Sequence, residues 1–215
     1  AWQLQEQARQ LKLAALGRLS ASIAHEIRNP LSAITQAGQL LAEDERLDAG
    51  QHKLLDMIQR HGTRIDRIIR DVLDLARPHD HPIPVIDLDR CVEQALGAYR
   101  EQPLTAAQVI HHHKASTARQ VRCDPAHLQQ VLHNLWENAA EHAPGRRVDV
   151  LSGRDSRGVT WLDICDAGPG IDPAMRERIF EPFVSSKTNG QGLGLALVQK
   201  LVRDMDGRVS HERDD

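Results

Sequence analysis

The segment SIAHEIRNP, residues 22–30, carries a histidine whose neighbours suit nucleophilic chemistry. Apolar residues recur here at steps of three and four, which predicts an amphipathic helix. At about 100° per residue, His25 falls opposite the apolar stripe, and Asn29 lies on nearly the same solvent face. The carboxylate of Glu26 stands beside His25 and can orient and polarise one ring nitrogen. The pattern suits a nucleophilic imidazole, but an isolated His-Glu pair is more often an ordinary solvated surface histidine, so the residues alone leave both explanations open.

A second set of polar residues lies in HLQQVLHNLWENAAEHA, residues 127–143. Asn134, Asn138 and His142 are spaced by four, so they share one face of a predicted helix with apolar flanks. Such a face is either solvated or occupied by a polar ligand, and the spacing alone leaves both explanations open.

The motif DAGPGI, residues 166–171, follows a predicted strand and supplies a carboxylate beside two glycines. Asp166 can accept a hydrogen bond from an exocyclic amino group such as that of adenine. Gly168 and Gly170 allow the backbone to approach a ligand closely. Glycine turns after strands are common, so this motif gains meaning only in combination with others.

The segment GQGLGLALVQ, residues 190–199, places Gly190, Gly192 and Gly194 before an apolar helix. Backbone amides at a helix N-terminus bind phosphate. The spacing is neither the dinucleotide fingerprint, which should open the first strand–helix unit, nor a P-loop, which needs GK followed by Ser or Thr. Lys187 lies just upstream and is either a phosphate clamp or a solvated lysine.

Between the two glycine motifs, IFEPFVSSK contains Phe180 and Phe183, the only two phenylalanines of the chain. We expect both to anchor a long loop. That loop would hinge a mobile lid over a nucleotide, or the two rings would simply pin it to the core.

The run HHH at residues 111–113 raises the question of a metal site. Alternate residues of a strand point to opposite faces, and no carboxylate or cysteine stands at ligand spacing nearby in the sequence. The run is therefore predicted not to bind a metal.

The element that must position His25 is one of two long helices. Its apolar stripe is followed by a break at residues 44–50, and a second stripe with heptad spacing ends before Pro78. The second stripe consists of Leu54, Ile58, His61, Ile65, Ile68, Val72 and Leu75. A lone hairpin cannot bury so continuous a stripe, so we expect two copies to form a four-helix bundle.

The asparagine and glycine motifs lie beyond a proline-rich linker, RPHDHPIP, in a region of mixed periodicity. The expected elements are a strand near residues 85–88, a helix at 91–99, a strand near Val109, a helix from Pro125 capped by Asp124, and paired strands at 146–153 and 159–166. This order predicts an α+β unit.

Composition limits the partners. The chain is 40% hydrophobic and 27% charged with a net charge of −3, which fits folded domains without a basic stripe for nucleic acid or a polybasic block for a membrane surface. Cys91, Cys123 and Cys165 form no CxxC pair, which fits a reducing cytoplasm. No apolar run reaches membrane-spanning length, and the chain, which begins in mid-helix without Met, is interpreted as a fragment.

Taken in order, AHEIRNPL, NLWENA, DAGPGI, the phenylalanine loop and GQGLG strongly resemble the five boxes of the sensor histidine kinases of two-component systems. The subgroup that these boxes resemble is that of the sensors of type IV pilus transcription and their nitrogen-sensor relatives. The resemblance implies an α-helical hairpin forming a dimeric four-helix bundle, followed by an α+β two-layer sandwich ATP-binding domain of the gyrase, Hsp90, histidine kinase and MutL type. The implied ranges are 1–77 for dimerisation and histidine phosphotransfer, 78–84 for the linker and 85–215 for ATP binding, with a C-terminal strand missing.

The resemblance also implies roles for single residues. His25 would accept the γ-phosphoryl group of ATP, Glu26 would act as base or orienter, and Asn29 would position a water that dephosphorylates a regulator. Asn138 would bind Mg2+. The residues implied to contact the nucleotide are Asn134, Asn138, Asp166, Gly168, Gly170, Lys187, Gly190, Gly192, Leu193 and Gly194.

The implied partners are a second copy of the chain and a response regulator, whose aspartate takes the phosphoryl group from His25. Contacts with nucleic acid or a membrane are not expected for this part of the protein. It would be the cytoplasmic core of a protein anchored in the bacterial inner membrane.

Two departures from the family and two alternatives remain open. Glu141 stands where the family often has a basic residue directed at phosphate, and GRVSHERDD stops where the family usually adds a final strand. An ATPase clamp of the gyrase, Hsp90 and MutL type needs a glutamate base four residues before the magnesium asparagine, and that position is Asn134. A dimeric scaffold with a dead nucleotide site would need a damaged box, and all five are present.

Overall fold

The chain folds into two compact units, residues 1–78 and 79–215. The structure, a computed structural model, describes residues 24–44, 46–77, 82–101, 108–114, 119–185 and 191–212. No helix within these ranges is long and apolar enough to cross a bilayer.

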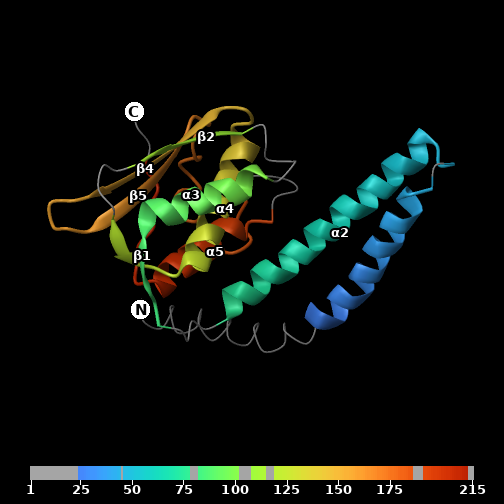
Figure 1. Cartoon of the computed structure of the whole chain (residues 1–215), viewed down its shortest axis with the longest axis horizontal. Helices are drawn as coiled ribbons and strands as arrows, with labels where there is room; N and C mark the ends of the chain where they lie inside the picture. Colours follow the sequence, from blue (N-terminus) through green and yellow to red (C-terminus); the bar gives the residue numbers. More distant parts are fainter. Residues whose placement is uncertain are drawn as a thin grey trace. The chain divides into compact units, whose positions relative to one another are not determined.

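The first unit is a helical hairpin (Figure 1). Its first helix covers residues 24–42, and α2 runs from Ala49–Ala76. Asp48 begins α2 through a capping box, because its side chain accepts from the Gln51 N–H at 2.8 Å while Gln51 Oε1 accepts from the Asp48 N–H at 2.9 Å. The predicted break at residues 44–50 is confirmed, and α2 starts at Ala49, one residue before the expected end of that break.

Close contacts show that the two helices are antiparallel. A Cβ atom on Gly62 would lie only 2.6 Å from Thr35 Oγ1, so the absence of a side chain lets the backbones approach. Further along, Arg28 Nε donates to Asp66 Oδ1 at 3.0 Å. Because residue numbers fall on one helix as they rise on the other, the hairpin brings Asp66 close to the turn that carries His25.

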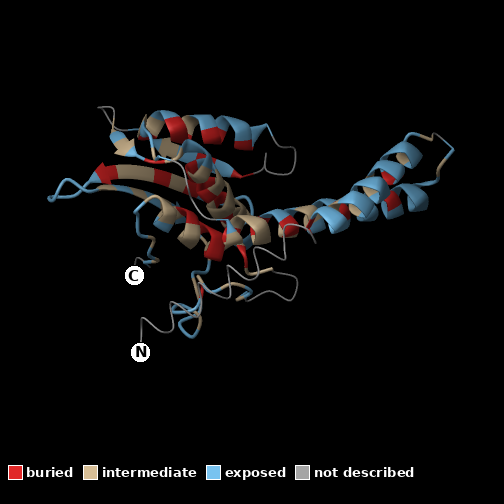
Figure 2. Ribbon diagram, turned by 90° about the horizontal axis from the view of Figure 1, so that it is seen from below, coloured by how far each residue is buried: buried red, intermediate tan, exposed pale blue. Residues whose placement is uncertain are grey.

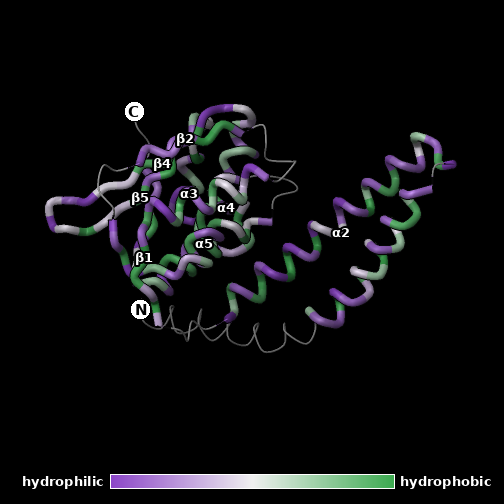
Figure 3. The backbone as a smooth tube through the Cα atoms, viewed as in Figure 1, coloured by the Kyte–Doolittle hydropathy of each residue, from purple (hydrophilic) through white to green (hydrophobic). Residues whose placement is uncertain are grey.

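The apolar seam inside the hairpin differs from the predicted heptad stripe by one position. The buried α2 residues Leu55, Gly62 and Ile69 recur every seven residues and face the first helix. In contrast, Leu54 and Ile65 of the predicted stripe are 61% and 41% exposed. Leu75 of the same stripe is buried, and Ile68 and Val72 are half-buried, so one hairpin covers the predicted stripe only in part. Apolar and polar stretches alternate along both helices (Figure 3).

The second unit is a two-layer α/β sandwich (Figure 1). Its elements in chain order are β1 Val85–Asp87, α3 Leu88–Arg100, β2 Val109–His113, β3 Gln120–Arg122, α4 Pro125–His142, β4 Arg147–Arg154, β5 Thr160–Asp166 and α5 Gly194–Asp204. Strand β4 pairs in parallel with β2 and antiparallel with β5, while β1 and β3 form a separate antiparallel ladder. The predicted α+β organisation is confirmed, but β3 was missed because three residues carry no usable periodicity.

Side-chain caps explain where two helices of this unit begin. Asp124 accepts from the N–H groups of Ala126 and His127, which confirms the predicted start of α4. Asp87 accepts from the Arg90 N–H, so α3 starts at Leu88 rather than at the expected residue 91.

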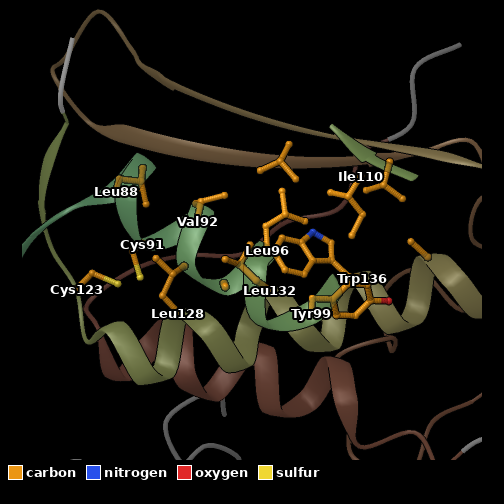
Figure 4. Packing of buried hydrophobic residues seen from close by; sticks show 14 residues of the cluster. Leu88, Cys91, Val92, Leu96, Tyr99, Ile110, Cys123, Leu128, Leu132 and Trp136 are labelled. Atoms are coloured by element: carbon orange, nitrogen blue, oxygen red, sulfur yellow. The ribbon is translucent and has the colours of Figure 1, made fainter. Parts of the chain in front are cut away.

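The core lies between the sheet and helices α3 and α4 (Figure 4). Trp136 and Leu132 of α4 are buried against Val148 and Val150 of β4 and against α3. The ring of Tyr99 packs edge-on against Trp136 with centroids 5.3 Å apart. This packing fixes α4, and therefore the asparagine face that α4 carries.

Candidate functional site

His25 lies on the first helix of the hairpin and is exposed, as its position opposite the apolar stripe predicted. Glu26 and Asn29 are also exposed. His25 lines an open groove of about 590 Å³, which is formed by residues of the hairpin alone. A ring nitrogen here is accessible to a reactant and contributes nothing to a buried core.

Charged side chains surround the groove in a way that the sequence analysis missed. Asp66 of α2 accepts from Arg28 Nε at Oδ1 (3.0 Å) and from an Arg70 terminal nitrogen at Oδ2 (2.8 Å). The spacing of Asp66 and Arg70 is a visible helical signal, but the partnership of Asp66 with Arg28 joins residues 38 positions apart. The groove beside His25 is therefore lined by ion-paired guanidinium groups.

The asparagine face of α4 contains a polar atom that lacks a partner. Asn134 and Asn138 are both half-buried. The Asn134 Nδ2 atom is buried and has no hydrogen-bond partner among the residues that the structure describes. An unpaired buried amide costs about 1–3 kcal/mol, so this face suits a polar ligand better than an empty solvated surface.

The DAGPG loop at the end of β5 presents one free side of a carboxylate. Asp166 Oδ1 accepts from the Gly168 N–H at 2.7 Å, which leaves Oδ2 for a ligand. A Cβ atom on Gly168 would lie 2.6 Å from that same Oδ1, and Gly170 has a φ of 76°. Gly168 also lines a pocket of about 390 Å³ together with His142 at the end of α4.

Arg146 ties this loop to the turn after α4 and was missed by the sequence analysis. Its Nη1 donates to the Ala167 carbonyl at 3.0 Å, while its own carbonyl accepts from Gln108 Nε2 at 2.5 Å. Nothing in the local sequence distinguishes Arg146 from any exposed arginine. Its contact holds the loop that carries Asp166 against the pocket.

The phenylalanine loop is anchored differently from the prediction. Ile179 is buried and Phe180 is half-buried, but Phe183 is 67% exposed. The prediction that both rings anchor the loop was therefore wrong for Phe183. Its left-handed backbone, with a φ of 67°, turns the chain so that its N–H donates to the Gly192 carbonyl at 2.8 Å.

The second glycine motif meets the phenylalanine loop through backbone atoms. Gly192 has a φ of 63°, and a Cβ atom there would lie 2.5 Å from the Val184 carbonyl oxygen. Helix α5 begins at Gly194, as predicted, and its N-cap residue Leu193 offers no side-chain acceptor. The first-turn amides of α5 thus suit an external anion. Lys187 and Gly190 lie outside the described residues.

The histidine run divides between the two faces of β2. His112 is buried beneath α3, with Nδ1 2.7 Å from Glu93 Oε1 and Nε2 3.1 Å from Asp89 Oδ1. The contact with His112 lowers the pKa of Glu93 below its ordinary value. Carboxylates that the sequence separation concealed therefore do reach His112, but no group of three potential metal ligands occurs within the described ranges.

His113 is exposed on the opposite face and lies 2.6 Å from Asp149 Oδ1. Arg147 and then His113 lower the pKa of Asp149 to about 2. His112 and His113 hence make separate contacts on opposite faces, in agreement with the alternation that the strand predicts.

Two protein families match the chain. Residues 15–80 match the His Kinase A (phospho-acceptor) domain. Residues 123–215 match the histidine kinase-, DNA gyrase B- and HSP90-like ATPase family.

Curated relatives match almost the whole chain. The sensor protein kinase PilS of Pseudomonas aeruginosa is 36% identical over 97% of the chain and 40% of its own length. The sensor histidine kinase ZraS of Klebsiella oxytoca is 35% identical over 98% of the chain and 46% of its own length. The chain thus spans less than half the length of these relatives.

Solved structures share the fold. Full-length ShkA in complex with AMPPNP superimposes with a TM-score of 0.69 at 25% identity, covering 88% of this chain and 41% of that protein. The mycobacterial sensor histidine kinase MprB gives a TM-score of 0.51 at 31% identity over 58% of this chain and 80% of that chain.

Proposed function

The chain belongs to the sensor histidine kinases of two-component systems, and we propose that it phosphorylates its own His25 with ATP and passes the phosphoryl group to a response regulator. The observation that carries this proposal is the exposed His25 beside a cationic groove, in a chain whose second unit offers an unpaired amide and uncapped helix amides. Such a pair of sites suits a phosphoryl donor and a phosphoryl acceptor.

In the second unit, ATP is the substrate that the site residues would hold. Asp166 Oδ2 would accept from the adenine amino group, and the glycines around residue 168 would let the base approach the backbone. Asn134 would pair its buried amide with the nucleotide, and the amides that open α5 would bind phosphate oxygens. The family resemblance extends this set to Gly190 and Lys187.

Mg2+ fits the same face, because an amide oxygen is a hard ligand and Asn138 is half-buried one turn after Asn134. When bound, the ion neutralises charge on the phosphate oxygens. In this proposal, Asn138 is the only ligand that the chain itself supplies.

At His25, one ring nitrogen would attack the γ-phosphorus with its lone pair. A nitrogen–phosphorus bond forms, the bond from phosphorus to the bridging oxygen breaks, and ADP leaves with that electron pair. Glu26 would hold the proton on the other ring nitrogen and so keep the attacking nitrogen unprotonated. Positioning supplies most of the catalysis.

Two partners complete the proposal. A second copy of the chain would cover the exposed stripe that contains Leu54, Ile58 and Ile65. A response regulator would receive the phosphoryl group on an aspartate. We also propose that this chain is the cytoplasmic core of a membrane-anchored sensor of the pilus and nitrogen-sensor subgroup.

The alternative of an ATPase clamp has less support. It requires a glutamate base at the position of Asn134, and it gives no use to an exposed histidine in a hairpin. The relatives that match nearly the whole chain are sensor kinases.

Incubation with γ-labelled ATP tests the proposal. The parent chain should gain an acid-labile, alkali-stable label, and His25→Gln should gain none while ATP affinity by calorimetry and dimerisation are unchanged. His52→Gln, at an exposed position of α2 outside the heptad stripe, is the matched control and should label like the parent. Label in His25→Gln, or none in the parent, would overturn the assignment.

The role proposed for Asn29 is tested separately. Asn29→Ala should keep most labelling and phosphotransfer but lose the ability to speed the dephosphorylation of a labelled regulator. Alanine is a good helix former and the site is exposed, so the helix tolerates the change. Regulator dephosphorylation as fast as with the parent would remove Asn29 from this role.

A further inference from the structure

The groove beside His25 contains more cationic than anionic side chains. Arg28, Arg70 and Arg77 line it together with Asp66 and Asp74. A phosphoryl group on His25 would bring a charge of about −1.5 to −2 into this groove. Guanidinium groups match phosphate oxygens in charge and geometry.

Arg28 is the guanidinium with the strongest geometric link to His25. It lies three residues after His25 on the same helix, and side chains at this spacing are neighbours. Its Nε atom donates to Asp66 Oδ1, which leaves the two terminal nitrogen atoms of the fork for another acceptor. The side chain is about one-third exposed, so an incoming group can reach it.

Asp66 holds this guanidinium in place. Each of its two carboxylate oxygens accepts from one arginine, Arg28 at 3.0 Å and Arg70 at 2.8 Å. The carboxylate comes from the other helix, so it fixes the position of Arg28 across the hairpin. It is also less exposed than Arg70, which restricts how the pair can move.

We propose that Arg28 binds the phosphoryl group carried by His25 and that Asp66 is a positioning residue for Arg28. This inference rests on the proposed function, because it concerns the phosphorylated form of the same histidine. The contact would therefore shift the equilibrium between ATP with unmodified His25 and ADP with phosphorylated His25 toward the phosphorylated form.

The sign of the Asp66 effect separates positioning from simple charge. If only charge mattered, removing a carboxylate near a phosphoryl dianion would raise the amount of phosphohistidine. If Asp66 positions Arg28, the same change lets the guanidinium leave and lowers that amount. The two explanations therefore predict opposite results for Asp66→Asn.

The experiment measures the fraction of phosphorylated His25 at equilibrium with a fixed ratio of labelled ATP to ADP. Arg28→Gln should lower the ratio of phosphohistidine to histidine about tenfold, because a charge-assisted hydrogen bond is lost. Asp66→Asn should lower it about threefold, the size expected for a partly exposed ion pair. ATP affinity, which depends on the second unit, should stay unchanged in both variants.

The chain supplies a matched control. Asp56 and Arg60 form an ion pair on α2 with the same four-residue spacing as Asp66 and Arg70, but outside the groove. Asp56→Asn should leave the phosphohistidine ratio as in the parent. Asp66→Glu should restore part of the loss, and circular dichroism should show all variants folded.

An unchanged or raised ratio in folded Asp66→Asn would overturn the positioning role. Equal losses in Asp66→Asn and Asp66→Glu would do the same, because they would assign the effect to packing rather than to the carboxylate. An unlabelled parent chain would instead refute the proposed function, so the two failures are distinguishable.

Discussion

The two units of this protein use apolar side chains in opposite ways. In the α/β unit, Trp136, Leu132, Val148 and Val150 are almost completely buried within one unit of the chain. In the hairpin, most apolar side chains outside the inner seam remain exposed (Figure 2). The α/β unit therefore completes its own core, whereas the hairpin needs another surface to complete its packing.

The candidate site residues differ between the two units in the same way as the apolar ones. In the hairpin, His25 and Asn29 are exposed, and charged side chains from α2 line the groove beside His25. In the α/β unit, Asp166 and Gly194 stand where a strand ends and a helix begins, next to a rigid core. A site built on the hairpin can accept changing partners, and a site at the ends of packed elements keeps one geometry.

The largest effect is expected in the core of the α/β unit. Trp136→Ala should reduce the free energy of unfolding of this unit by about 3–5 kcal/mol. Trp136 Nε1 has no hydrogen-bond partner among the described residues, so the loss comes from packing. Urea unfolding followed by circular dichroism measures it. Trp161→Ala, the same change at a half-exposed strand position, should cost clearly less, and equal losses would contradict the comparison.

The hairpin should lose association rather than folding. Ile65→Lys places a charge in the exposed stripe, and the change occurs in both copies of a dimer. At about 1.5 kcal/mol or more for each isoleucine that stays in water, dimer affinity should fall by at least about 3 kcal/mol. Sedimentation velocity measures the shift to monomer. Thr63→Lys, on the opposite side of α2, is the control, and a monomeric parent chain would contradict the prediction.

A smaller effect is expected at the nucleotide site, without loss of stability. Asp166→Asn replaces an acceptor oxygen by a donor in one orientation, so ATP affinity should fall by about 1–3 kcal/mol. The Asp166 side chain is exposed, so the unfolding midpoint of the α/β unit should not move. Calorimetry measures the affinity. Asp163→Asn, three residues earlier on β5, should bind ATP as the parent does.

The smallest effect concerns pH. The pKa of Glu93 is lowered by its contact with His112. Ionised Glu93 therefore adds to the free energy of unfolding above its ordinary pKa of 4.5, and this stabilisation is lost as the pH falls through the lowered pKa of the folded state. Solvent screening limits this contribution to less than about 1 kcal/mol. Acid unfolding of the parent and of Glu93→Gln measures it. Glu93→Gln should lack this loss of stability at low pH. Identical acid-unfolding profiles of the parent and the variant would show that the contact between Glu93 and His112 is not its source.

Local chemistry in the sequence predicted much of this protein. Asp124 and the following proline predicted the start of α4, and the alternating strands around RDSRG predicted β4 and β5. The asparagine spacing predicted a polar face on α4, and the DAGPGI and GQGLG motifs stand at the end of β5 and the start of α5, as the sequence predicted. These features depend on neighbours within a few residues, so a single sequence contains them.

Other predictions failed where distant parts of the chain meet. The loop anchor is Ile179 rather than Phe183, because the backbone contact with Gly192 turns Phe183 outward. The carboxylates around His112 come from α3, which the strand pattern cannot reveal.

The sequence by itself determined the helices, the heptad stripe and the exposed position of His25, because side-chain periodicity within one element fixes them. Only the tertiary structure decided that α2 turns Leu55, Gly62 and Ile69 inward, one position away from the heptad stripe. It also decided that Asp66 meets Arg28 across 38 positions. The physical reason is that contacts between elements depend on how closely two surfaces pack, and a close approach such as that at Gly62 is a property of the pair and not of either segment.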